Sequence, residues 1–192
     1  MGEIIVQQFV TLDGVMQAPG DANEFELGGW QRQFISEDQL TVVTKQASEA
    51  GALLLGRKTY EGFAAAWPSA TGMMGLADRM NIMPKYVISN TLKQAEWNAK
   101  VISGDAVEEV IKLKQQHDRD LLVLGSGNLI QTLIKHRLID EFRIWMFPIV
   151  LGSGERLFRL GSEKINMSLV DTKTLSSGGV ILTYRTINQI KF

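Results

Sequence analysis

The stretch Asp120–Leu138, DLLVLGSGNLIQTLIKHRL, contains the pattern that decides the fold of this chain. It opens with a continuous apolar run, Leu121–Leu124, which is typical of a β-strand buried on both faces. The run ends at Gly125-Ser126-Gly127, and the residues that follow have the composition and spacing of a helix. A buried strand, a glycine turn and a helix together form the repeating unit of an α/β protein with a parallel sheet.

The same unit occurs earlier in the chain. ALLLG, residues 52–56, predicts a buried strand, and RKTYEGFAAAW, residues 57–67, predicts a short helix directly after it. KYVIS (85–89) and AKVIS (99–103) predict two further strands, and EIIVQQFV (3–10) predicts the first. Ser36 and Gln39 have the spacing of a capping box before a helix over 37–50, and Asp105 is a predicted helix cap.

The last third of the chain changes rhythm. The segments 140–152, 165–175 and 179–187 all have strand composition, and no helical pattern separates them. SSGG, residues 176–179, supplies a turn of the hairpin type between the last two. We therefore predict a single domain over residues 1–192, with a mostly parallel central sheet, antiparallel strands at its C-terminal end and helices on both faces.

Composition excludes several classes of protein. The chain has 192 residues, a net charge of −1, no cysteine and only two histidines. Disulfides, thiolate metal sites and histidine-rich zinc clusters are therefore excluded, and no metal site is predicted. The near-neutral charge argues against nucleic-acid binding, and no apolar run reaches the ~18 residues of a membrane span. The N-terminus lacks the pattern of a signal peptide, so we expect a cytoplasmic protein that contacts no membrane.

The motif VLGSG occurs twice, at residues 123–127 and 150–154. In the first copy, the glycines let the backbone approach an anion closely, and the following helix adds the positive end of its dipole. Neither copy matches a strict nucleotide motif, because Ile130 stands where the dinucleotide fingerprint needs its third glycine. A glycine turn that only ends a strand is an equally good interpretation of this motif alone.

A second candidate anion site lies at the end of the strand over residues 52–56. There Gly56 is followed by Arg57, Lys58 and Thr59 at the predicted start of a helix. Basic side chains, a hydroxyl and free helix N–H groups are the donors that a phosphate needs. Because ligands of parallel sheets lie at the carboxyl ends of strands, the ends at Gly56, Ser89 and Gly125 are expected to face one extended ligand.

GRKTYE, VISNT, VLGSGNLIQTLI and FPIVLGSGERLF, taken in this order, resemble the dihydrofolate reductase-like fold, and more specifically the reductase domain of bacterial riboflavin biosynthesis. The resemblance runs from FVTLDGVM to the last predicted strand. It implies a three-layer α/β fold and a reductase that uses NADPH. It also implies which residues bind the cofactor: Gly56, Arg57, Lys58, Thr59, Ser89, Asn90, Gly125, Ser126, Gly127, Asn128 and Leu129. On this interpretation the first VLGSG holds the pyrophosphate, and the second mainly turns the chain.

Candidates for substrate binding and catalysis lie in the loop after the first strand. Asp13 and Gly14 match the SLDG segment on the substrate side of the riboflavin reductases, so Asp13 is a candidate catalytic and substrate-binding residue. The alternative is that Asp13 only forms the turn. Trp30 is a candidate wall for a flat ring, or else a core residue. Glu37 and Asp38 lie near where folate reductases carry a carboxylate, but the motif is unmatched and both fit the first turn of a helix.

The resemblance implies an NADPH-dependent reductase of a pterin-like or pyrimidine-like heterocycle. Reduction of 5-amino-6-(5-phosphoribosylamino)uracil is the named activity that it suggests. One departure is Val15, which stands where the riboflavin enzymes usually carry a basic residue. True folate reduction is less favoured, because its acidic motif is unmatched. The alternative from another class is a non-catalytic nucleotide-binding or interaction protein that keeps the fold.

The segment DEFRIWMFPIV, residues 140–150, carries the prediction about assembly. It is long, apolar and aromatic, and it falls near the end of the predicted sheet. An exposed strand of this kind needs to be covered. We therefore expect a homodimer, as in the reductases that the chain resembles.

Overall fold

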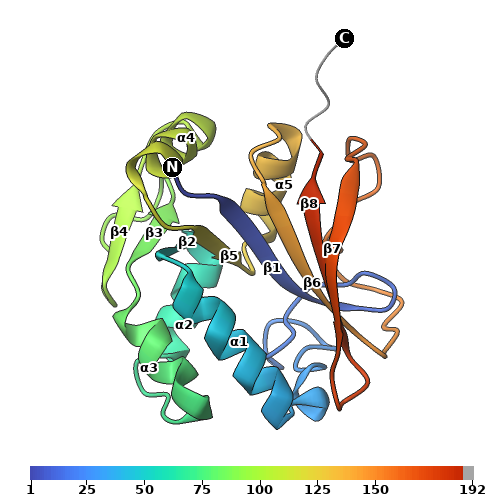
Figure 1. The fold of residues 1–192 in the computed structure, drawn as a ribbon. Helices are drawn as coiled ribbons and strands as arrows, with labels where there is room; N and C mark the ends of the chain where they lie inside the picture. Colours follow the sequence, from blue (N-terminus) through green and yellow to red (C-terminus); the bar gives the residue numbers. More distant parts are fainter. Residues whose placement is uncertain (188–192) are drawn as a thin grey trace.

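The computed structural model describes residues 1–187, and its centre is one eight-stranded sheet (Figure 1). The strand order is β4-β3-β2-β5-β1-β6-β8-β7. The bounds are β1 Ile4–Thr11, β2 Ala52–Gly56, β3 Lys85–Ile88, β4 Ala99–Ile102, β5 Leu121–Leu124, β6 Glu141–Phe147, β7 Met167–Thr174 and β8 Val180–Thr186. Strands β1 to β6 are parallel, and β8 and β7 continue the sheet in antiparallel pairing.

Helices cover both faces of this sheet. The bounds are α1 Glu37–Glu49, α2 Arg57–Ala66, α3 Leu76–Ile82, α4 Ala106–Gln116 and α5 Gly127–Lys135, with short 3-10 turns at Arg32–Phe34 and Met73–Gly75. Helices α1, α2 and α3 lie on one face and α4 and α5 on the other (Figure 1). The predicted three-layer α/β class, with antiparallel strands at the end, is confirmed.

Two separate apolar cores hold the layers together. On one face, side chains of β1, β2 and β5 such as Val6, Leu54 and Val123 pack against α4 and α5. On the other face, their sequence neighbours such as Leu53 and Leu122 pack against α1, α2 and α3. The central strands are buried on both faces because neighbouring side chains point in opposite directions, which explains their continuous apolar runs.

The two predicted caps have different outcomes. The Asp105 carboxylate accepts hydrogen bonds from the backbone N–H groups of Val107 and Glu108 at 2.9 and 3.0 Å, so this cap is confirmed. The capping box at Ser36 is wrong, because the Ser36 hydroxyl donates to Asp38 at 2.6 Å instead. The Asp38 carboxylate also accepts from the backbone N–H of Ser176 at 2.7 Å, which ties the start of α1 to the β7–β8 turn.

The expectation that the segment 140–150 forms an exposed strand is also wrong. Strand β6 pairs with β1 on one side and β8 on the other, so it is an interior strand. Trp145 and Phe147 of β6 are almost completely buried. The sheet instead ends at β7, whose residues are mostly exposed.

Candidate functional site

The turns that follow β2 and β5 lie side by side and bind each other directly. The backbone N–H of Ser126 donates to the Thr59 hydroxyl at 2.7 Å. In return, the Ser126 hydroxyl accepts from the backbone N–H of Gly56 at 3.0 Å and donates to the Leu124 carbonyl. The prediction that these two strand ends come together is therefore confirmed, and hydroxyl groups hold them in fixed relation.

The joined turns place two helix N-termini next to each other. Helix α2 begins at Arg57 and α5 at Gly127, and neither N-cap residue makes a side-chain capping bond. The first N–H groups of a helix have no partner within the helix, and they carry the positive end of its dipole. Since neither helix is capped, both present open N–H donors at the carboxyl-end edge of the sheet. This arrangement suits an anionic ligand with more than one phosphate.

The two glycines of the first VLGSG have different roles. Gly125 has a φ of +56°, and a Cβ atom on it would lie 2.8 Å from the Thr59 methyl carbon. This position therefore requires glycine to bring the two turns together. Gly127 has no such backbone requirement, and the atoms nearest to a Cβ there would be the Glu155 carboxylate at 3.5 Å and the end of the Met16 side chain at 3.7 Å. Gly127 leaves space beside the first turn of α5.

The basic residues of the α2 turn are exposed. Arg57 is paired with Glu61, one helical turn later, at 3.1 Å, and both side chains are about half exposed. Exposed pairs of this kind contribute little to stability, so Arg57 can exchange Glu61 for another anion at small cost. Lys58 is exposed at the same helix start. Both side chains are thus available to a ligand at this edge.

Ser89 and Asn90 lie at the same edge, but their side chains already hold the loop between β3 and β4. The Ser89 hydroxyl accepts from the backbone N–H groups of Thr91 and Leu92 at 3.2 and 3.0 Å. The Asn90 side chain accepts from the N–H of Gly104 at 2.7 Å and donates to its carbonyl at 3.1 Å. Since β3 pairs with β2, the structure brings Ser89 beside the α2 start, where it shapes the rim.

Two charged residues that sequence reasoning missed flank the start of α5. Arg159 donates to the Asn128 side-chain oxygen at 2.9 Å and lies 3.5 Å from the Glu155 carboxylate. Both residues belong to the segment GERLFR that follows the second VLGSG. This loop turns the chain at Gly152 and Gly154, as predicted, and also lies beside the first VLGSG. The only sequence signal for these two residues was the alternation of charges after a glycine turn.

Leu129, also in the predicted set, is buried under the helix start.

The structure favours the turn-forming alternative for Asp13. Its carboxylate accepts from the Thr11 hydroxyl at 2.6 Å and from the backbone N–H groups of Leu151 and Gly152 at 3.2 and 2.9 Å. These hydrogen bonds, that of Thr11 first, lower the pKa of Asp13 below its usual value. A proton donor needs a raised pKa, so the geometry gives Asp13 the role of joining two loops rather than of an acid. Gly14, with a φ of +84°, completes the turn.

The structure likewise favours the core alternative for Trp30. Its side chain is only 5% exposed, and its ring packs edge-on against Phe147 at 5.9 Å. The indole N–H donates to the Gln17 carbonyl at 2.9 Å, which satisfies its one polar group. Phe34 packs against the same Phe147 ring. These aromatic side chains hold the long loop 12–35 on the sheet.

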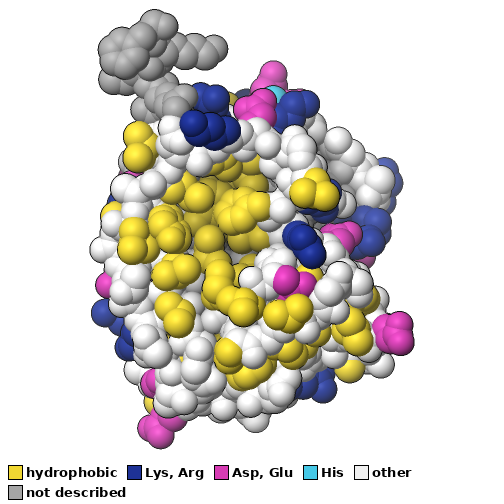
Figure 2. Space-filling model, turned by 90° about the vertical axis from the view of Figure 1, so that its right-hand side faces the viewer, with side chains coloured by type: hydrophobic (Ala, Val, Ile, Leu, Met, Phe, Trp, Pro, Cys, Tyr) yellow, Lys and Arg dark blue, Asp and Glu magenta, His cyan; other side chains and the backbone are white. Residues whose placement is uncertain are grey.

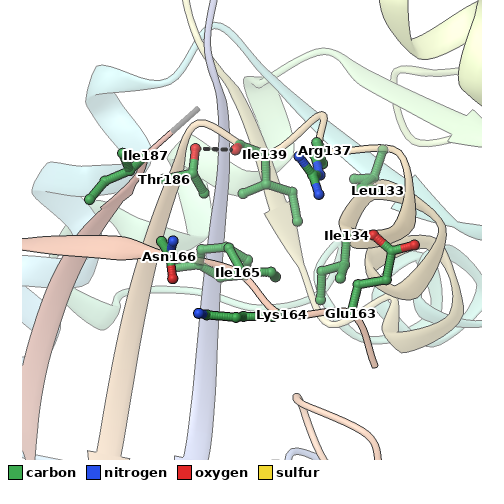
Figure 3. Close-up of a pocket in the computed structure, with 11 residues that line it drawn as sticks. Leu133, Ile134, Arg137, Ile139, Glu163, Lys164, Ile165, Asn166, Thr186 and Ile187 are labelled. Atoms are coloured by element: carbon green, nitrogen blue, oxygen red, sulfur yellow. Dashed lines mark hydrogen bonds between the residues drawn. The ribbon is translucent and has the colours of Figure 1, made fainter. Parts of the chain in front are cut away.

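Two hollows in the surface lie at the opposite end of the sheet, where the parallel strands begin. One, of about 40 Å³, lies between the end of α5 and the segment 163–166, where Thr186 donates to the Ile139 carbonyl at 2.8 Å (Figure 3). A volume of this size holds one or two waters, so it excludes a heterocycle. The other opens beside Lys85 and Trp97, at the amino end of β3. Neither borders the two helix N-termini.

Within residues 1–187, no three histidine, aspartate or glutamate side chains are grouped as a metal ion requires. No helix within the same residues has the length and apolar composition needed to cross a bilayer.

The comparisons with known proteins agree with this architecture. The family model of the RibD C-terminal domain matches residues 3–181. YyaP of Bacillus subtilis is 41% identical over 100 residues, a region that spans 52% of this chain and 53% of YyaP, about half of each protein.

Solved structures share the fold at low sequence identity. A candidate riboflavin biosynthesis protein from Shewanella sp. PV-4 has a TM-score of 0.78 at 21% identity, covering 97% of this chain and 99% of that one. Dihydrofolate reductase from Enterococcus faecalis, solved with NADP(H), has a TM-score of 0.66 at 15% identity, covering 97% and 98%. The fold is dihydrofolate reductase-like, and the chain belongs to the RibD C-terminal domain family, a family of reductase domains.

Proposed function

We propose that this chain is an NADPH-dependent reductase that acts on a pyrimidine-like or pterin-like heterocycle. The observation that carries the proposal is the joined pair of uncapped helix N-termini, fixed by the bond between Ser126 and Thr59. Two sets of open N–H donors at one edge fit a ligand with a pyrophosphate and a further phosphate. Membership in a family of reductase domains supplies the reaction class.

In this proposal each part of the site has a separate task. The first-turn N–H groups of α5, at Gly127, Asn128 and Leu129, hold the pyrophosphate. Arg57 leaves Glu61 and binds the 2′-phosphate, which a planar guanidinium can grip with two hydrogen bonds. Bound NADPH supplies the hydride, and the protein's contribution is to position the cofactor and the ring that accepts it.

The substrate side of the site is proposed to lie between the loop 12–17 and the loop 150–159. The backbone of the two loops is joined at Val15 and Arg156 in an isolated antiparallel bridge. Arg156 and Arg159, both exposed, are the cations on this side of the site. These two arginines can bind the anionic group of a substrate such as 5-amino-6-(5-phosphoribosylamino)uracil. The apolar Val15, at the position where the riboflavin enzymes usually carry a basic residue, cannot do so.

The state of Asp13 favours a second function. Its carboxylate accepts hydrogen bonds from Thr11, Leu151 and Gly152, and its lowered pKa favours the ionised form, so it is a poor proton donor for the reduction. A nucleotide-binding protein of this fold that performs no turnover is therefore the alternative. The two functions share NADPH binding and differ only in the reaction.

One experiment tests the proposal in two stages. NADPH is first titrated into the wild-type protein and into Gly127→Val, whose side chain fills the space beside the α5 start without a positive φ. We expect binding by the wild type and its loss in the variant. Gly62→Val is the matched control, because Gly62 faces open space in the middle of α2, and we expect it to bind NADPH.

The second stage follows NADPH oxidation with a set of oxidised pyrimidines and pterins. Turnover of one of them supports the reductase. Binding without turnover of any supports the alternative, and absence of NADPH binding by the wild type contradicts both.

A further inference from the structure

Two adjacent glutamines, Gln7 and Gln8, lie in the middle of β1 and point to opposite faces of the sheet. Gln8 pairs with Ile144 of β6, on the face that α4 and α5 cover, and Gln7 faces α1, α2 and α3. Both are almost completely buried, with 3% of Gln7 and 4% of Gln8 exposed. The Gln8 amide donates to the Gly125 carbonyl at 2.8 Å, whereas the Gln7 amide oxygen has no hydrogen-bond partner among the described residues.

The surroundings of Gln8 are apolar. Its neighbours on the same face, Val6, Val10 and Ile144, are all buried in one core. Figure 2 shows how far this apolar side of the sheet extends, since its hydrophobic side chains continue across β8 and β7. Burial of an amide in such surroundings is unfavourable unless the amide is hydrogen-bonded. The hydrogen bond to Gly125 is therefore what allows a glutamine at this position.

The peptide group between Gly125 and Ser126 is held at both of its ends. Its carbonyl oxygen accepts from Gln8 of β1, and its N–H donates to the Thr59 hydroxyl of α2 at 2.7 Å. Because a carbonyl can only accept, the Gln8 side chain must present its NH2 group to Gly125. Gly125 and Ser126 both have left-handed backbones, with φ values of +56° and +59°. This conformation is unfavourable for serine, so outside contacts determine how the peptide is oriented.

The orientation of this peptide sets the electrostatics between the two helix starts. A peptide group carries a dipole of about 3.5 D, and its oxygen is the negative end. The N–H and the C=O of a trans peptide point in opposite directions, so the oxygen is directed to β1 while the N–H is directed to α2. A rotated peptide would turn the Gly125 oxygen toward the starts of α2 and α5. A negative dipole end at that place would repel a pyrophosphate.

We propose that Gln8 is a positioning residue of the candidate cofactor site. Its side-chain amide holds the Gly125 carbonyl toward β1 and so keeps that oxygen out of the space for the pyrophosphate. Gln8 acts through Gly125 and does not itself touch the cofactor. This inference rests on the proposed function, because it assumes that NADPH binds across the starts of α2 and α5. It adds β1 to the elements that build the site.

Titration of NADPH into a matched pair of variants, Gln8→Met and Gln7→Met, tests the proposal. Methionine is about as long and flexible as glutamine but has no amide, and both positions are buried in the same strand. We expect Gln8→Met to bind NADPH roughly five- to tenfold more weakly than the wild type, the scale of one lost hydrogen bond. We expect Gln7→Met to bind NADPH like the wild type, because the Gln7 amide oxygen has no partner to lose.

Amide NMR of the ligand-free protein supplies a readout that a general loss of stability does not reproduce. The Gly125 carbonyl and the Ser126 nitrogen belong to one delocalised peptide group, so loss of the hydrogen bond to the oxygen changes the nitrogen-15 shift of Ser126. We expect this shift in Gln8→Met and not in Gln7→Met. In the wild type, we expect one side-chain N–H proton of Gln8 to exchange slowly with solvent, a measurement that needs no variant.

Several outcomes overturn the role of Gln8 alone. They are wild-type affinity for NADPH in Gln8→Met, an equal loss of affinity in both variants, weaker binding with an unchanged Ser126 amide, and rapid exchange of the Gln8 side-chain protons in the wild type. Absence of NADPH binding by the wild type is a different outcome. It contradicts the proposed function itself, and the role of Gln8 with it.

Discussion

Ser126 and Thr59 join the two halves of the candidate site, although 67 residues separate them in the chain. The backbone N–H of Ser126 has the Thr59 hydroxyl as its acceptor at 2.7 Å, and Ser126 is 7% exposed. Ser126 has a left-handed backbone, with a φ of +59°, so this hydrogen bond also holds an unfavourable conformation in place. The relative position of α2 and α5 therefore depends on two hydroxyls, that of Thr59 and that of Ser126.

Replacing Thr59 with valine, which has the same shape without the hydroxyl, tests this dependence. A buried N–H left without an acceptor costs about 1–3 kcal/mol, so we expect unfolding by denaturant to show a loss of that size. NADPH binding should weaken as well, because the two helix starts lose one of the two hydrogen bonds that hold them together. Thr59→Ser keeps the hydroxyl and should retain most of both. Equal stability of the valine variant and the wild type would show that the hydrogen bond contributes nothing.

Lys85 predicts an unusual dependence of stability on pH. Its side chain is 1% exposed, and its ammonium lies 4.0 Å above the Trp97 ring and 2.6 Å from the Met83 carbonyl. Burial, with a smaller contribution from the nearby Arg79, lowers the pKa of Lys85 to about 8. In the unfolded chain this group keeps its proton to about pH 10.4. Between these values the unfolded state binds more protons, so stability rises with pH.

The expected rise between pH 8 and pH 10.4 is roughly 3 kcal/mol in the free energy of unfolding. Lys85→Met removes the titrating group, so its stability should lack this rise, while other titrations stay the same. Urea unfolding of both proteins at a series of pH values measures the difference. Parallel pH profiles would show that Lys85 titrates normally in the folded protein.

Asp13→Asn separates the two roles considered for Asp13. If the residue joins loops, the variant weakens its hydrogen bonds to Leu151 and Gly152, and stability should fall by about 1–2 kcal/mol. Because the pKa of Asp13 is lowered in the folded protein, the wild type should also lose this stability as the pH falls into the acid range. The variant should not, because asparagine does not titrate. A variant with unchanged unfolding and no turnover would instead restore the catalytic role.

Arg57→Ala tests how the site distinguishes the two nicotinamide cofactors. NADPH carries a 2′-phosphate that NADH lacks, and a hydrogen bond to a charged group contributes about 1.5–3 kcal/mol. We expect NADPH to bind more weakly by that amount and NADH to bind almost unchanged. Glu61→Gln releases Arg57 from its partner and should leave NADPH binding the same or tighter. Equal losses for both cofactors would assign Arg57 to the pyrophosphate they share.

The elements predicted well from the sequence are those with a local pattern. The runs ALLLG and LLVLG, each followed by a helix, fixed both the parallel sheet and the edge where Gly56 and Gly125 meet. Their apolar continuity follows directly from burial on both faces. The contacts of Asp13 and Val15 with residues about 140 positions later have no local signal, because they depend on how two loops pack. For the same reason Glu155 and Arg159 were missed.

The order of the last strands is a further case. Three consecutive strands without helices predict antiparallel pairing, but composition does not say which one lies at the edge. The apolar segment 140–150 is interior because β6 pairs with β1, a contact between the first and last thirds of the chain. The exposed apolar side chains instead lie on one face of β8 and β7. The register of the strand pairing, which composition does not give, shows which residues share that face.

The most direct test of the site is amide NMR of the protein labelled with nitrogen-15, titrated with NADPH. We predict saturable shifts of the amides at the two helix starts, Gly127, Asn128 and Leu129 of α5 and Arg57, Lys58 and Thr59 of α2, with smaller changes elsewhere. Saturation of both groups at one NADPH per chain would place the cofactor across the joined turns. Unchanged amides at both helix starts, with shifts confined to other parts of the chain, would contradict this site.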